Sequence, residues 1–369
     1  MKTKPCYHLC FLPPHILEKI IDGGTPMQKD RALKVLTLSG QIRGRRQSLH
    51  KIRFPFPRTL QPGKQRFVYT ANFGSGLPGT IVRSEGQPPA ADITVNEAYD
   101  GAGDTYDLFL DQYSRNSIDG AGMQLISTVH YEQGYDNAFW NGEQMVYGDG
   151  DEDLPQAERL FNRFTAAIDV IGHELTHGVT QFEAKLVYWE QSGALNESFS
   201  DVFGSLVKQK KLNQTADQAD WLIGQGLFTS NVNGVAIRSM KAPGTAYNDP
   251  LLGKDPQPAH MRDYVETASD NGGVHINSGI PNKAFYLAAM ECGGYAWEKA
   301  GKIWYIALRD KLIERSTFQD AANMTYNVAG DLFGKDSNEQ KAVKTGWEGV
   351  GISIGGKKRC WLWRWMFKN

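Results

Sequence analysis

A five-residue run, His-Glu-Leu-Thr-His at 173–177, constrains this chain more than any other feature. On an α-helix, residues four apart lie about one turn apart on one face, so the imidazoles of His173 and His177 can bind the same ion. Glu174 lies beside the two histidines without being a ligand. Its carboxylate can therefore take a proton from a water that the metal has made acidic and later pass it to a departing amine. The run predicts a helix, a zinc ion and a general base at one place.

The residues around this run favour its placement on a helix. Apolar side chains at three- and four-residue spacing predict a helix from about 168 to 184 with a buried face, namely Ile168, Ile171, Leu175 and Val179. A second helix, from about 194 to 207, would put Glu197 and Asp201 one turn apart. Glu197 could then be the third ligand while Asp201 accepts the free N–H of a ligand imidazole. The alternative is a pair of buried core histidines beside an ion-paired glutamate.

Three separate motifs resemble the thermolysin-like zinc metalloendopeptidases and occur in the order of that family. They are HELTHGVTQFEAKLVYWEQSGALNESFSDVFGSL, YDNAFWNGEQMVYGDGD and DNGGVHINSG. The resemblance covers roughly residues 65 to 354. The start of the chain, with Pro13-Pro14-His15-Ile16-Leu17, is similar to the protealysin-like branch in its precursor form.

This resemblance implies a set of site residues. The zinc ion would be held by His173, His177 and Glu197, with Glu174 as the general base. The remaining catalytic roles would be two oxyanion donors and the groups that orient them or the zinc ligands, namely Tyr188, His275, Asp270 and Asp201. The substrate strand would be held by Asn137, the backbone of Ala138 and Arg238. Neutral or cationic donors are the right types for an oxygen that gains negative charge, but spacing alone does not bring Tyr188 and His275 together.

The resemblance also implies an apolar pocket for the residue after the cut. Its lining would be Phe161, Phe164, Val170, Ile223, Leu227 and Ile237. Burial of a Leu or Phe side chain there is worth about 1.5–3 kcal/mol, which gives a roughly tenfold to hundredfold preference over small or polar residues. We therefore expect cleavage before Leu, Phe, Ile or Val. Each of the six residues could also be ordinary core.

The expected fold class is α+β, with two lobes and the zinc helices in the cleft between them. The lobe at 61–190 should be β-rich, because alternating Val, Ile, Thr and Tyr between Phe67 and Tyr147, as in 125–131, predict a twisted antiparallel sheet. The lobe at 191–354 should be mainly helical. Its apolar residues have helical spacing at 284–290, 303–315 and 321–333.

The composition gives no sign of a nucleic-acid partner, because the formal net charge of the 369 residues is −1. The expected partners are protein and peptide substrates, and we expect a monomer. The N-terminal residues lack a long apolar run and contain Pro13-Pro14, so we expect no secretory signal peptide, synthesis in the cytoplasm and any export without a leader. No run is long and apolar enough to span a bilayer.

Residues 1–60 are expected to be a short propeptide that covers the cleft, which is what the resemblance implies. The stretch 41–66 is basic, contains three prolines and has no periodicity, so it reads as an exposed linker that must be cut. Three bonds there precede an apolar residue: Ser48-Leu49, Arg53-Phe54 and Thr59-Leu60, the last being preferred. Cys6 and Cys10 lie in this propeptide, and one hypothesis is that a thiolate from either binds the zinc before activation.

Calcium is expected to bind more weakly than in many relatives of the resembled family. Where those place acidic calcium ligands, this chain has Asp169 and Asp220 but also Lys208 and Gln225. An ammonium there repels a divalent ion, so we expect no double calcium site. A single weaker site could involve the run Asp149, Asp151 and Asp153, whose alternative is a solvated turn.

The last segment, 355–369, is a basic, Trp-rich tail outside the resembled pattern. Its tryptophans could lie at a membrane interface, or the tail could have no function. Two other functions stay open beside a zinc endopeptidase made as a zymogen. One is a zinc aminopeptidase, although no glycine-rich motif for a free amine is present. The other is a catalytically silent binding protein whose cleft stays covered by residues 1–60.

Overall fold

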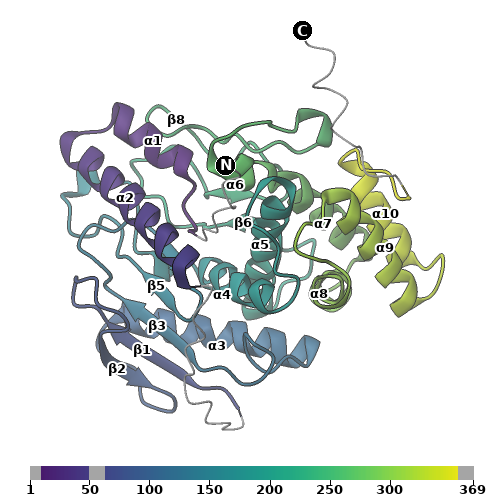
Figure 1. The fold of residues 1–369 in the computed structure, drawn as a ribbon, viewed down its shortest axis with the longest axis horizontal. Coiled ribbons are helices and arrows are strands. Elements are labelled where there is room, and N and C mark those ends of the chain that lie inside the picture. The colour runs from purple at the N-terminus through teal and green to yellow at the C-terminus, as the bar shows by residue number, and fades with distance from the viewer. Residues whose placement is uncertain (1–9, 50–62, 356–369) are drawn as a thin grey trace.

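Two buried helices, α4 (Ile168–Phe182) and α5 (Glu190–Leu212), pack closely at the centre of the fold (Figure 1). The structure is a computed structural model and describes residues 10–49 and 63–355. A Cβ atom on Gly172 would lie 3.0 Å from the Cα of Gly204, and one on Gly204 would lie 2.4 Å from the carbonyl oxygen of Asp169. These two glycines therefore permit the close approach that a shared metal site on both helices needs. Both helices are confirmed, and α5 extends beyond the predicted 194–207.

A five-stranded sheet lies on one side of this helix pair, in the order β2-β1-β3-β5-β4. β1 runs antiparallel to β2 but parallel to β3, β3 runs parallel to β5, and β5 runs antiparallel to β4. The bounds are Arg66–Thr70 for β1, Thr80–Ser84 for β2, Leu125–Val129 for β3, Ala138–Trp140 for β4 and Met145–Tyr147 for β5. The fold class is confirmed, but the prediction of an antiparallel sheet is wrong, because the sheet is mixed.

The cause is a helix that the sequence analysis missed, α3 (Ile93–Tyr113), between β2 and β3. A helical connection carries the chain back across a sheet, so the next strand can pair in parallel. Asp92 caps the N-terminus of this helix, because its carboxylate accepts the Thr94 amide at 2.9 Å. A periodic signal was present, since the buried residues of α3 recur at three- and four-residue spacing: Val95, Ala98, Tyr99, Ala102, Tyr106, Phe109 and Tyr113.

Helices on the other side of α5 form the C-terminal group: α6 (Asp270–Asn277), α7 (Gly279–Cys292), α8 (Ala300–Asp310), α9 (Phe318–Phe333) and α10 (Asn338–Gly349). The predicted helices at 284–290 and 321–333 are confirmed. The one predicted at 303–315 ends early at Asp310, and Ile313 beyond it is 70% exposed, so the apolar spacing continued past the helix. Between α5 and α6 lie two short ladders, β6 (Leu222–Ile223) with β7 (Arg238–Ser239) and β8 (Asn248–Asp249) with β9 (Gly253–Lys254).

The N-terminal segment contributes two helices, α1 (Pro14–Gly23) and α2 (Pro26–Leu49), drawn in purple in Figure 1. The linker expected from residue 41 is therefore wrong up to residue 49, because α2 continues to Leu49. The bond Ser48-Leu49 lies at the end of α2, whereas the other two candidate bonds, Cys6 and the tail at 356–369 lie outside the described residues.

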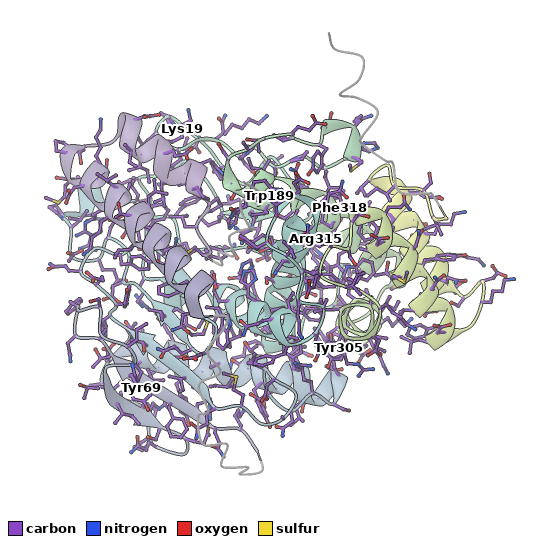
Figure 2. All side chains as sticks on the ribbon, in the orientation of Figure 1. Lys19, Tyr69, Trp189, Tyr305, Arg315 and Phe318 are labelled. Carbon is purple, nitrogen blue, oxygen red and sulfur yellow. The ribbon has the colours of Figure 1, made fainter. Side chains whose placement is uncertain are left out.

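Side chains fill the space between the N-terminal helices and the rest of the protein, as Figure 2 shows, with Lys19 labelled near one edge and Tyr69 on the sheet. Contacts that link α2 to the sheet-bearing lobe include Gln28 to the Glu158 carbonyl at 2.9 Å, Arg31 to Asp153 at 2.7 Å and Lys34 to Glu132 at 2.9 Å. Within the described part of the chain, no helix combines the length and apolarity that crossing a bilayer requires.

Candidate active site

Two helices bring the three predicted zinc ligands together. His173 and His177 project from α4 and Glu197 from α5, and each is completely buried. The Nε2 atoms of the two histidines each lie 3.5 Å from a different oxygen of Glu197. These two nitrogens and the Oε2 atom of Glu197 are buried without a hydrogen-bond partner. Two imidazoles and a carboxylate with unsatisfied atoms fit a zinc ion, and among the described residues they alone place three ligand atoms within 4.8 Å.

Hydrogen bonds on the opposite ring nitrogens orient both histidines. The Nδ1 atom of His173 lies 2.8 Å from Asp201 Oδ1, as predicted from helical spacing. The Nδ1 atom of His177 lies 2.8 Å from Asn196 Oδ1 and 2.9 Å from the hydroxyl of Ser200. Because an Nδ1–H that donates to these oxygens leaves the lone pair on Nε2, both rings present that nitrogen to a metal.

Asp201 is itself held from three sides. Arg238 donates from Nε and Nη2 at 2.9 and 2.8 Å, and Asn282 donates at 2.8 Å. Burial alone would raise the pKa of Asp201, but the charge of Arg238 and the His173 hydrogen bond keep that pKa well below its usual range. Asp201 is therefore a carboxylate, which fixes the tautomer of His173.

A second constellation faces the zinc group. The hydroxyl of Tyr188 donates to Glu197 and lies 3.1 Å from His275 Nε2. Asp270 accepts from His275 twice, at the ring Nδ1 (2.6 Å) and at the backbone amide (2.8 Å). Burial lowers the pKa of His275, but the carboxylates of Asp270 and Glu197 outweigh it and raise this pKa to about 9. The structure thus places two hydrogen-bond donor side chains beside the predicted metal.

Paired glycines produce the turn that places His275. Gly272 and Gly273 have φ angles of 84° and 76°, in the left-handed region that glycine adopts without strain. A Cβ atom on Gly272 would lie 2.7 Å from the Cγ of Glu190. This left-handed turn lies inside α6, between Asp270 and His275.

Glu174 lies on α4 beside both zinc ligands and is completely buried. Its Oε2 atom accepts the backbone amide of Trp140, at the end of β4, at 2.8 Å. This places a carboxylate at the junction between the metal group and the edge strand.

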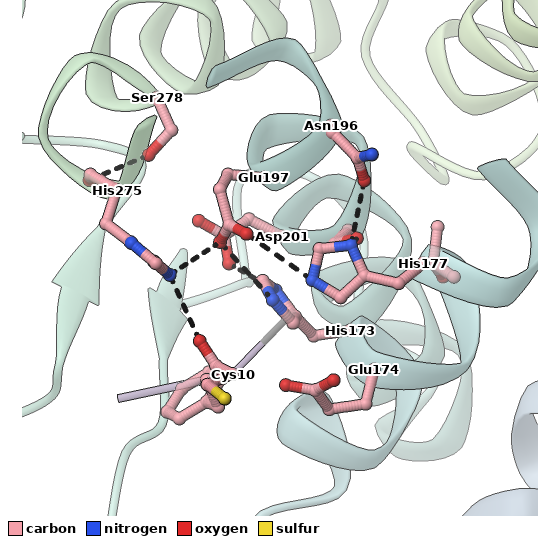
Figure 3. A network of polar contacts seen from close by, with 12 residues as sticks. Cys10, His173, Glu174, His177, Asn196, Glu197, Asp201, His275 and Ser278 are labelled. Atoms are coloured by element: carbon pink, nitrogen blue, oxygen red, sulfur yellow. Dashed lines mark hydrogen bonds and ion pairs between the residues drawn. The ribbon is translucent and has the colours of Figure 1, made fainter. Parts of the chain in front are cut away.

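The chain's own residues 10–12 lie where the substrate strand was predicted, with Cys10 paired antiparallel to Phe139 of β4. Figure 3 shows the carbonyl of Cys10 facing His275. The amide of Phe11 donates to the Ala138 carbonyl at 3.1 Å, and the amide of Leu12 donates to Asn137 Oδ1 at 2.9 Å. Two carbonyls point the other way, toward donors of the site. His275 Nε2 lies 3.0 Å from the Cys10 carbonyl, and Arg238 Nη1 donates to the Phe11 carbonyl at 3.2 Å.

The side chain of Phe11 enters the predicted apolar pocket. Its ring packs edge-on against His173 at 5.3 Å and Phe164 at 6.5 Å between centroids, and the Arg238 guanidinium lies 4.5 Å from its centroid. Its Cζ atom lies beside Gly224, next to Ile237 and Leu227. All six predicted lining residues are buried: Phe161, Phe164, Val170, Ile223, Leu227 and Ile237.

Cys10 meets this site through its carbonyl and not through its sulfur. The Sγ atom donates to the Ser39 hydroxyl at 3.6 Å. The cluster of possible metal ligands contains two histidines and Glu197 but no cysteine. The hypothesis that the Cys10 thiolate binds the metal is therefore wrong for this conformation. Backbone direction decides which part of a residue faces the metal, and this was not readable from the sequence.

An ammonium occupies the position where the double calcium site was considered. Lys208 Nζ lies 2.8 Å from Asp220 and 3.5 Å from Asp169, and it also donates to the Leu222 carbonyl at 3.2 Å and to Gln225 at 3.4 Å. Asp169 is 1% exposed. The charge of Lys208 thus compensates a buried carboxylate that joins α4 to β6.

Several functional contacts were missed by the sequence analysis. Asn196 precedes Glu197 on the same helix. The helical spacing that pointed to Asp201 as the acceptor for a ligand imidazole could therefore also have pointed to Asn196. Phe11 and Leu12 carried no local signal, because their partners are more than a hundred residues away.

Comparison with known proteins gives a consistent result. The family model for the thermolysin metallopeptidase catalytic domain matches residues 71–181, and the model for the alpha-helical domain of thermolysin metallopeptidase matches 184–352. A relative named extracellular metalloprotease, from Pectobacterium carotovorum subsp. carotovorum, is 49% identical over 96% of this chain and 99% of its own. Bacillolysin from Bacillus cereus is 41% identical over 79% of this chain and 50% of its own length. A solved structure described as the precursor of protealysin, a metalloproteinase from Serratia proteamaculans, has a TM-score of 0.84 at 51% identity, covering 93% of this chain and 99% of that one.

Proposed function

This chain belongs to the thermolysin-like metallopeptidases, and from that premise we propose that it is an endopeptidase that cuts before bulky apolar residues and is made as a zymogen. The observation that carries the proposal is the seating of Phe11. An apolar side chain of the chain itself fills the pocket beside the zinc group, while its backbone pairs with β4. A peptide substrate with Leu, Phe, Ile or Val after the cut would use the same contacts.

The proposed reaction assigns each side chain a step. Zinc, when bound by His173, His177 and Glu197, supplies Lewis-acid chemistry. Glu174 takes a proton from the attacking water as the water oxygen bonds to the peptide carbon. Tyr188 and His275 donate hydrogen bonds to the carbonyl oxygen as it gains negative charge. The C–N bond then breaks, and Glu174 gives the proton to the departing nitrogen.

The positions of the substrate-binding groups support a defined direction for the peptide. Asn137 and the Ala138 carbonyl hold the amides of an extended strand, and Arg238 holds the carbonyl that follows the cut. Pro13 has no amide N–H, and Pro14 begins α1, so strand pairing ends after Leu12 and the N-terminal segment turns out of the cleft. Residues 10–12 would thereby block the cleft until the segment is removed.

We further infer that the double calcium site is absent, because the Lys208 ammonium compensates Asp169 and Asp220. The weaker single site predicted at Asp149, Asp151 and Asp153 is a separate matter. In this structure His130 holds Asp149 at 2.8 Å, and Arg31 holds the other two.

The test compares the purified full-length protein with Glu174→Gln, each with and without a zinc chelator, by mass spectrometry of the chain and of a denatured protein substrate. We expect the parent protein to cut the substrate before apolar residues and to cut its own chain in the 49–60 region. Both kinds of cut should be absent in the Glu174→Gln variant and in the presence of the chelator. Elemental analysis of both proteins should show one zinc per chain. Processing of pure Glu174→Gln at the normal rate would exclude self-processing, and cuts clustered before Lys or Asp would exclude the pocket assignment.

A further inference from the structure

The turn after β5 holds an arginine of the N-terminal segment where a metal cation could lie. Arg31, on α2, donates from Nη2 to both oxygens of Asp153 at 2.7 Å. Its Nη1 atom donates to the Gly150 carbonyl at 3.3 Å and to Asp151 Oδ1 at 3.4 Å. Burial lowers the pKa of Arg31, but Asp153, and then the charge of Asp136, outweigh it and raise this pKa. One guanidinium therefore binds two carboxyl groups, Asp151 and Asp153, and lies near a third, Asp136.

Two of these carboxyl groups are buried, at 5% exposure for Asp136 and 2% for Asp151. The Oδ2 atom of Asp151 accepts the amides of Leu160 and Phe161 at 2.8 and 2.9 Å, which leaves Oδ1 for Arg31. The Oδ1 atom of Asp136 is buried and has no hydrogen-bond partner. Burial, and then the charge of Asp151, raise the pKa of Asp136 well above its usual range. The cluster thus contains an unsatisfied oxygen, although Arg31 is present.

We propose that Asp136, Asp151, Asp153 and the Gly150 carbonyl form a calcium site of the processed enzyme, and that Arg31 occupies this site in the precursor. The proposal rests on the proposed function, because α2 must leave with the N-terminal segment. Loss of Arg31 would leave three carboxyl groups without a cation, two of them in a poorly solvated position. All the donors are oxygens, and a cluster on a turn suits Ca²⁺, which accepts six to eight oxygens in flexible geometry, better than Mg²⁺.

Calcium would require the site to contract. Among the described residues only the zinc group has three such ligand atoms within 4.8 Å of one another, so the oxygens of these three carboxyl groups lie further apart. Asp153, whose side chain is 41% exposed on the turn, is the group that can move inward. The site would also reach the substrate cleft, because Asp136 precedes Asn137 and Asp151 holds the amide of Phe161. Bound calcium would then order the backbone before β4 and the pocket wall at Phe161, as Arg31 does in the precursor.

The experiment removes the Arg31 side chain from the calcium site while the N-terminal segment stays attached. Full-length Glu174→Gln protein, zinc loaded, is compared with the same protein carrying Arg31→Ala, and the Tm is measured with CaCl₂ or with NaCl at equal ionic strength. With Ca²⁺ a hundredfold above its dissociation constant, the Tm of the Arg31→Ala protein should rise by about 3–4 °C, and that of the parent by about 1 °C or less. Equilibrium dialysis with radioactive calcium should give one additional ion per chain.

Two matched controls make the outcome specific. Lys34→Ala removes another ion pair of the same helix, 2.9 Å from Glu132, and should give no calcium response. Arg31→Ala with Asp153→Asn should lose the response. Arg31→Gln, which keeps most of the side-chain volume, replaces Arg31→Ala if that variant does not fold. A missing calcium response in the vacated site, or an equal response in either control, would overturn the proposal. Since the background is inactive, a failure of self-processing leaves this result interpretable.

Discussion

Replacing Phe11 by alanine should weaken the closure of the cleft more than any other single change in the N-terminal segment. Phe11 is 0% exposed and contacts His173, Phe164 and the Arg238 guanidinium. Truncation of a fully buried phenylalanine costs about 3–5 kcal/mol, since contacts are lost and a cavity remains. Only the docked segment has these contacts, so the equilibrium between docked and undocked segment should shift by the same amount, or roughly 10² to 5 × 10³-fold.

The assay is calorimetric titration of an active-site ligand, a peptide hydroxamate with Leu after the metal-binding group, into zinc-loaded protein in the Glu174→Gln background. The apparent Kd equals the intrinsic Kd divided by the fraction of open protein. Phe11→Ala should therefore lower the apparent Kd by roughly 10² to 5 × 10³-fold, until most molecules are open. The apparent Kd of Phe11→Leu should lie between that of the parent and that of Phe11→Ala.

Leu33→Ala is the matched control, because Leu33 lies on α2 in the same segment but is 55% exposed. Its apparent Kd should stay within about twofold of the parent, as expected for a surface change away from the contacts. An unchanged Kd for Phe11→Ala, or an equal fall for Leu33→Ala, would refute the view that Phe11 closes the pocket.

Three further predictions concern other parts of the structure. Glu174→Gln should lower kcat/KM on an apolar peptide by about 10²–10⁴-fold with zinc content unchanged, and activity near the parent level would remove Glu174 as the general base. Lys208→Met should reduce the free energy of unfolding by about 3 kcal/mol in denaturant titration, because Asp169 would lose its buried cation. CaCl₂ should restore part of this stability. Equal denaturation midpoints for the variant and the parent would contradict this prediction. His130 bridges Asp149 at 2.8 Å and Asp92 at 2.7 Å, and their hydrogen bonds, Asp149 first, raise its pKa to about 9. The stabilisation that charged His130 gives is therefore full below pH 6.5 and is lost as the pH rises through about 9. After allowance for solvent screening, His130→Gln should be about 1 kcal/mol less stable than the parent at pH 6 and equally stable near pH 10. A stability difference that stays constant with pH would exclude a charged His130.

The elements that the sequence predicted poorly are those whose form depends on distant partners. α3 carries helical spacing, but glycines and aromatic residues masked it. The parallel pairing of β1 with β3 follows from the return path that α3 provides, which no strand pattern contains. The end of α8 at Asp310 also escaped prediction, since apolar spacing continues to the exposed Ile313.

The groups that could be predicted from residue order are those whose geometry is local. His173, Glu174 and His177 lie on one helix, and Glu197 and Asp201 lie on the next, so the 3.6-residue period orders each set before any tertiary contact forms. The fold sets what faces these groups: Phe11 in the pocket, the carbonyl of Cys10 instead of its sulfur on His275, and Arg31 beside the carboxyl groups of the turn after β5. A contact between segments a hundred residues apart depends on the path and direction of the backbone, and no local periodicity records either.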